Sequence, residues 1–195
     1  MENSLDQIQI KWHKLLKIAE NAGDRSHSIV SMLDDLGERY IMAPAALSSH
    51  QAGACPGGLL ETTLSVIKKM SSLSRALDLD VSTESIVVVG ICHSLGLLGG
   101  PQQGEDYLVR QDSDWHIRQG KLYKFGENVT KMPVAHRSLY LTQHFGIRLS
   151  HDEWQAIALS GGQSREENRF YVGSECTLSV LLMQARQWVF GDSNS

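Results

Sequence analysis

Hydrophobic residues recur every three or four positions along most of the chain, which is the spacing of one face of an α-helix. A first helix is predicted from Leu5 to Ala19, and a second from about Asp24 to Leu36, with Gly37 as its stop. Further helices are predicted at about Leu59–Leu77 with Leu77 facing inward, at His136–Phe145, from Ser150 onward behind a capping box with Glu153, and at Ser174–Phe190.

Two segments depart from this simple pattern. Ile86–Val89 is β-branched, as in a buried strand, but Ser82 or Thr83 can cap a helix and the apolar run continues through Leu95, so a buried helix is favoured. Residues 97–132 lose the helical period, and DWHIRQGKLYKFG (114–126) predicts a β-hairpin that turns near Gln119–Gly120. The fold class is therefore mostly α, a single helical bundle with a small inserted β-hairpin at about 105–126.

Length and composition fit one domain of ordinary size, because the chain has 195 residues of which 42% are hydrophobic and 21% charged. We expect residues 1–37 to form N-terminal helices packed on the core, residues 38–190 the main helical domain, and residues 191–195 a frayed tail. The sequence contains no apolar run long enough to predict a membrane span, and the N-terminus lacks the pattern of a secretory signal. Three widely spaced cysteines favour a reduced, cytoplasmic protein.

The charge pattern argues against a broad surface for duplex nucleic acid, because the net charge is −4 and no block of Lys or Arg occurs. The hairpin region mixes aromatic and basic residues, as surfaces that stack nucleobases do, but an amphipathic hairpin that covers a core has the same pattern and is favoured. These residues are Tyr107, Arg110, Trp115, His116, Arg118, Lys121, Tyr123 and Lys124. Trp12, Trp154 and Trp188 fall on helical faces and are expected in the core.

Four stretches carry the candidate chemistry: RYIMAPAALSSHQAGACPGGLLETTLSV (39–66), ICHSLGLLG (91–99), AHRSLYLTQHFGIRLSHDEWQAIALSGG (135–162) and LLMQARQWVF (181–190). Together they resemble the HD-domain superfamily of metal-dependent phosphohydrolases, in particular a phage and bacterial branch, over about residues 38–190. The resemblance implies an HD-like helical bundle in which His and Asp side chains hold a divalent cation. That cation generates a hydroxide and neutralises the phosphate during hydrolysis.

The ligand positions of that family are largely replaced here. They fall on Thr62, His93, Ser94, Met183 and Arg186, and an acidic position falls on Gly161. A single imidazole does not hold a divalent ion, because such sites use three or more protein ligands, and Arg186 adds a permanent positive charge. We therefore expect a catalytically inactive protein without a metal cofactor. A divalent metal would need ligands from elsewhere, such as His50, Asp112, Asp114 or His116.

Five residues are candidates for binding a ligand in the former catalytic cleft: His50, His93, Lys131, Arg137 and Arg186. Lys131, His136 and Arg137 surround a helix N-terminus, which attracts anions. Each candidate also has a structural interpretation; Arg186, for example, can pair with Glu61 and close the site. The first hypothesis is binding of a nucleotide or other small phosphate for sensing or sequestration. The alternatives are a scaffold with a closed cleft and a protein partner, and a metal-dependent phosphohydrolase with an unusual site.

Overall fold

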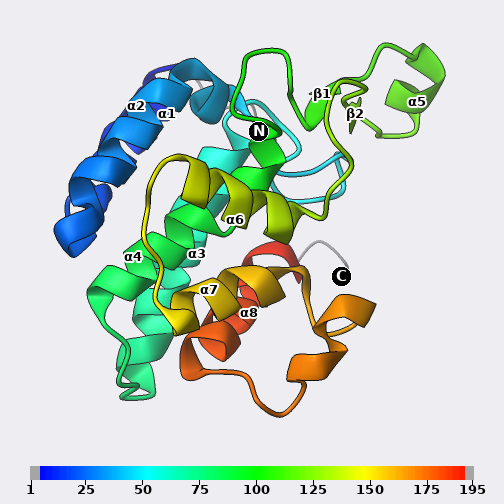
Figure 1. Cartoon of the computed structure of the whole chain (residues 1–195). Helices are drawn as coiled ribbons and strands as arrows, with labels where there is room; N and C mark the ends of the chain where they lie inside the picture. Colours follow the sequence, from blue (N-terminus) through cyan, green and yellow to red (C-terminus); the bar gives the residue numbers. More distant parts are fainter. Residues whose placement is uncertain (1–4, 192–195) are drawn as a thin grey trace.

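Two amphipathic helices begin the part of the chain that the computed structural model describes, residues 5–191 (Figure 1). Helix α1 spans Leu5–Ala19 as predicted, and a 3₁₀ turn, η1 (Gly23–Arg25), leads into α2 (Ser26–Met42). The predicted break at Gly37 is confirmed locally, but a second helical stretch follows it directly and α2 runs on to Met42. Gly37 adopts φ 44° and ψ −124°, which kinks α2. Because glycine tolerates a positive φ, helical geometry resumes after one residue.

Helices α3 (Gly58–Ala76) and α4 (Thr83–Cys92) form the centre of the bundle, and α8 (Thr177–Phe190) packs along α3 (Figure 1). The helical prediction for the β-branched segment is confirmed, since the Ser82 hydroxyl accepts a hydrogen bond from the backbone N–H of Ser85 and caps α4. All residues of α4 from Ile86 to Cys92 are buried, which explains why its sequence shows no polar face. Leu77 is exposed, contrary to prediction, because α3 ends one residue before it.

The insertion differs from the predicted hairpin. Strands β1 (Leu108–Arg110) and β2 (Tyr123–Phe125) pair antiparallel, with Leu108 opposite Phe125, after a 3₁₀ turn η2 (Leu95–Leu98). Between the strands lies a short helix, α5 (Asp114–Arg118), so the turn at Gln119–Gly120 ends this helix and does not join two paired strands. The residues at 114–118 lack the strict alternation of a strand, and Gly120, with φ 80°, follows the end of α5.

The C-terminal half completes the bundle with α6 (Val134–His144), α7 (His151–Ala158), the 3₁₀ turns η3 (Leu159–Gly161) and η4 (Glu166–Tyr171), and α8 (Thr177–Phe190). The capping box is confirmed, because Ser150 and Glu153 exchange side-chain and backbone hydrogen bonds. Trp154 and Trp188 were expected in the core but are 46% and 57% exposed. Glu153 occupies the inward position on α7, which turns Trp154 outward, and Trp188 lies beneath Lys69 on the surface.

One continuous hydrophobic core joins the N-terminal helices to the rest, because residues of α1 and α2 such as Leu15 and Met32 belong to the same buried cluster as those of α4 and α8. Cys92 lies in this core, and Cys55 and Cys176 are partly exposed free thiols. None of the helices described between residues 5 and 191 has the length and apolar character to span a membrane. Apart from Gly191, the predicted frayed tail lies outside the described residues.

Candidate functional site

A cavity of about 430 Å³ lies where the end of α4, the start of α6, the η3–η4 segment and α8 meet. Its outer side is bounded by the loop before α3 and by the inserted sheet, which Figure 1 shows across from η4. Four positions at which the resemblance to HD-domain proteins implied ligand residues line this cavity: His93, Ser94, Gly161 and Arg186. The fold therefore brings together residues that are up to 93 positions apart in the chain (186 − 93). Thr62 and Met183 do not line this cavity.

His93 ends α4 and is 1% exposed. Its Nδ1 lies 2.9 Å from the carbonyl oxygen of Gly90 and 3.2 Å from that of Val89. A carbonyl only accepts, so Nδ1 carries the proton and Nε2 is the acceptor of a neutral ring. Burial lowers the pKa of His93 to about 3, with a further contribution from the charge of Arg186. The imidazole is consequently uncharged at neutral pH.

Arg186 extends from α8 and is half-buried in the cavity wall. Its guanidinium carbon lies 5.0 Å from the ring centre of Phe190. Burial lowers its pKa to about 10, so it keeps its charge at neutral pH. The hypothetical pair with Glu61 does not form, because the Glu61 carboxylate lies 3.1 Å from Nζ of Lys11. Among residues 5–191, no carboxylate forms an ion pair with Arg186.

A chain of hydroxyl groups lies beneath the cavity floor. The buried Tyr40 hydroxyl donates to Oγ1 of Thr63 at 3.1 Å, and Oγ1 of Thr63 lies 3.4 Å from Oγ of Ser94. Burial raises the pKa of Tyr40, so its hydroxyl stays protonated and acts as the donor. Thr63 can then donate its own hydroxyl hydrogen bond to Oγ of Ser94, which leaves the Ser94 hydroxyl able to donate into the cavity. Sequence analysis did not single out Thr63 or Tyr40, although a buried tyrosine usually signals a hydrogen-bond partner.

The start of α6 forms another wall of the cavity through Val134, Ala135 and His136. Pro133 precedes the helix without a side-chain cap, so the first N–H groups have no helical acceptor and carry the positive end of the helix dipole. Gly96 allows α6 to come this close, because a Cβ at Gly96 would lie 2.1 Å from the carbonyl oxygen of Val134. This wall favours an anion.

Three of the predicted ligand-binding residues lie elsewhere. Arg137 follows His136 by one position and therefore points to another side of α6, where it donates to the carbonyls of Thr130 at 2.6 Å and Gly96 at 3.3 Å and lies over the ring of Tyr107. It is a buried structural contact between α6 and the insertion. Lys131 and His50 are exposed and do not line the cavity.

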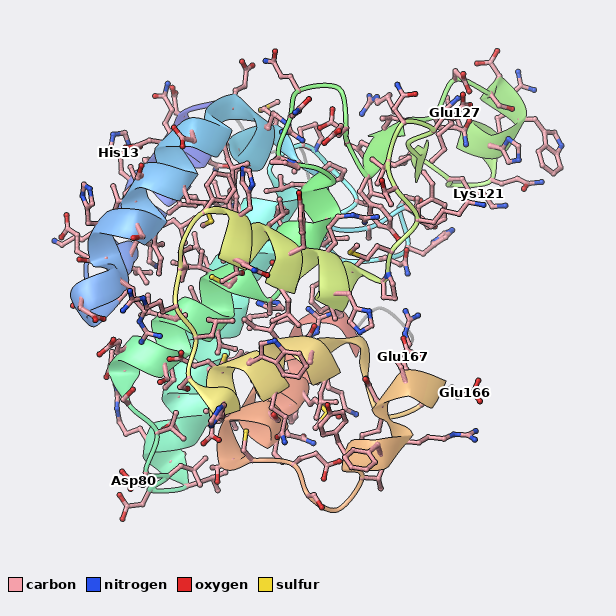
Figure 2. The ribbon with its side chains drawn as sticks, viewed as in Figure 1. His13, Asp80, Lys121, Glu127, Glu166 and Glu167 are labelled. Atoms are coloured by element: carbon pink, nitrogen blue, oxygen red, sulfur yellow. The ribbon has the colours of Figure 1, made fainter. Side chains whose placement is uncertain are left out.

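Sequence analysis did not predict two residues at the outer rim of the cavity. Arg165 and Glu167 line the outer part of the cavity and are exposed, and Figure 2 shows Glu167 on the η4 segment, across from Lys121 and Glu127 of the insertion. The buried Asn168 donates to the carbonyl of Gly162 at 2.7 Å and holds this loop in place. The rim therefore carries one cation and one anion, and Arg186 is the charge deeper in the wall.

The side chains present do not fit a catalytic metal. Within residues 5–191 no three His, Cys, Asp or Glu side chains are grouped as a metal ion would need. Of the alternative ligands considered, Asp112 pairs with Lys124 at 2.7 Å and His116 packs against Trp115, both in the insertion. The cavity lining in residues 5–191 offers the imidazoles of His93 and His136 and the rim carboxylate of Glu167, but these do not form such a group, and His93 lies beside the fixed positive charge of Arg186.

No protein-family model, no curated protein and no solved structure matches this chain. Interpretation of the cavity rests on its own residues: a neutral His93, a charged Arg186, a buried hydroxyl chain and an uncapped helix start.

Proposed function

We propose that this protein binds a small phosphate-bearing ligand, such as a nucleotide, in the cavity beside His93, and that it senses or sequesters this ligand without hydrolysing it. The observation that carries the proposal is the Arg186 guanidinium, a half-buried charge that lines the cavity and has no ion-pair partner within residues 5–191. Removing a charge from water costs free energy unless an opposite charge compensates it. An anionic ligand supplies that compensation.

Phosphate suits this environment better than other anions do. A guanidinium binds two oxygens of a phosphate side by side, and the uncapped start of α6 adds backbone donors in the same cavity. Leu97, Phe125 and Phe190 provide an apolar surface for an organic group attached to the phosphate. A volume of about 430 Å³ falls within the range of pockets that hold small molecules.

The resemblance to HD phosphohydrolases supports the same cleft as the ligand site, while the replaced positions argue against hydrolysis. Ser94 and Arg186 stand where that family would have an aspartate and a late metal ligand, and neither can serve in their place. A scaffold with a closed centre is less well supported, because the cavity is open and Arg186 is not neutralised by Glu61.

Isothermal titration calorimetry with mono-, cyclic and dinucleotides, inorganic phosphate and succinate tests the proposal. We expect a phosphate compound to bind and Arg186→Gln to weaken it roughly 10- to 100-fold, the loss of one charged hydrogen-bonding group. Arg148→Gln, an exposed arginine outside the cavity, is the matched control and should bind like wild type. Absence of binding by every phosphate compound, or equal binding by the Arg186 variant, would contradict the proposal.

A further inference from the structure

The acceptor nitrogen of His93 restricts which phosphate compounds fit the cavity. Resting on the function proposed above, we propose that the ligand is a hydroxyl-bearing phosphate ester, a sugar phosphate or ribonucleotide, whose hydroxyl group donates a hydrogen bond to Nε2 of His93. The phosphate lies at Arg186 and the start of α6, and the hydroxyl lies at His93. His93 is then a specificity determinant.

The tautomer of His93 is imposed by the backbone of its own helix. Nδ1 lies within hydrogen-bond distance of two carbonyl oxygens, those of Val89 and Gly90, and both can only accept. The proton must therefore stay on Nδ1, and Nε2 presents a lone pair. Because the ring also stays neutral next to Arg186, His93 does not become a second cation for the phosphate.

No group of the protein described between residues 5 and 191 donates a hydrogen bond to this Nε2. The Ser94 hydroxyl accepts from Thr63 but makes no hydrogen bond to the ring, and Arg186 makes none to it either. Nε2 does not belong to the fully buried, unpartnered atoms of residues 5–191, so water in the cavity can reach it. A ligand that displaces this water without supplying a donor loses free energy, so a good ligand brings a donor. Phosphate oxygens at neutral pH are acceptors, so a phosphate oxygen placed at Nε2 would be repelled by the lone pair of that nitrogen. A hydroxyl supplies the missing proton.

The decisive comparison uses matched ligands on the unaltered protein. Ribonucleoside 5′-monophosphates are compared by calorimetry with their 2′,3′-dideoxy counterparts, and ribose 5-phosphate with methyl phosphate. The second pair shows whether a base is needed. We expect each hydroxyl-bearing ligand to bind roughly 5- to 150-fold more tightly than its partner, the effect of displacing water from one acceptor without replacing its hydrogen bond.

Two variants assign the preference to His93. His93→Phe removes the acceptor and should bring the hydroxyl-bearing ligands down to the affinity of their partners. His93→Gln keeps a carbonyl acceptor and should restore part of the difference. In ¹⁵N spectra of the histidine-labelled protein, the Nε2 signal of His93 should shift when ribose 5-phosphate binds and stay in place with methyl phosphate.

The possible failures are distinguishable. If both members of each pair bind equally while Arg186→Gln weakens both, the hydroxyl contact is overturned and phosphate binding stands. If no phosphate compound binds, the proposed function fails and this inference fails with it. Should His93→Phe not fold, the ligand pairs and the ¹⁵N spectra of the wild-type protein still decide the question.

Discussion

Glu153 is the buried carboxylate whose loss should most clearly destabilise the bundle. It is 1% exposed and receives hydrogen bonds from Nη1 of Arg25 at 2.5 Å, from Oγ of Ser85 at 2.8 Å and from the backbone N–H of Ser150 at 2.8 Å. These contacts tie η1, α4 and α7 together. Burial by itself raises the pKa of Glu153, but the hydrogen bonds from Arg25, Ser150 and Ser85 outweigh it and hold the pKa below its ordinary 4.5.

Glu153→Gln isolates the charge, because glutamine keeps the oxygen that accepts from Ser150 in a capping box. A hydrogen bond to a charged group contributes about 1 kcal/mol more than a neutral one, so three such bonds give a loss of about 3 kcal/mol. For a chain of this size that lowers Tm by roughly 6–12 °C. Urea unfolding and calorimetry measure both quantities.

The control is Glu84→Gln, which removes a partner of the same arginine. Glu84 is 38% exposed and lies 2.6 Å from Nη2 of Arg25, so water screens the pair and the cost should be at most about 1 kcal/mol. The difference in unfolding free energy between wild type and Glu153→Gln should become smaller at acid pH. A lowered folded-state pKa contributes stability above the ordinary value and loses it as pH falls below 4.5. A Glu153→Gln protein within about 1 kcal/mol of wild type at pH 7 would refute the reasoning.

Two further predictions concern the cavity. Because the folded-state pKa of His93 is about 3 and its ordinary value is 6.5, the unfolded chain gains a proton first as pH falls. Wild-type stability should therefore drop by about 1.4 kcal/mol per pH unit below pH 6, and His93→Gln should remove this slope in urea unfolding between pH 6 and 5. Gly96→Ala should cost about 2 kcal/mol and weaken ligand binding, because the new Cβ pushes the start of α6 away; an unchanged Tm would exclude that close approach.

Part of the site could be anticipated from sequence and part could not. Comparison of motifs placed His93, Ser94, Gly161 and Arg186 at one centre, and the fold lines one cavity with them. The direction of each side chain was less predictable. Arg137 and His136 are adjacent in the sequence, yet His136 lines the cavity while Arg137 is buried against backbone carbonyls, because successive helical residues point about 100° apart.

Local sequence determined the helix ends and their caps. The Ser82 cap of α4 and the Ser150–Glu153 capping box depend on contacts three residues apart, which the chain makes whatever surrounds it. Only the tertiary structure decided which partners meet across the chain. Arg25 pairs with Glu153 at a separation of 128 residues, whereas no carboxylate of residues 5–191 forms an ion pair with Arg186 beside His93. A periodic pattern specifies which face of a helix is buried, but the opposing charge or acceptor comes from another element, and its position depends on how all the helices pack.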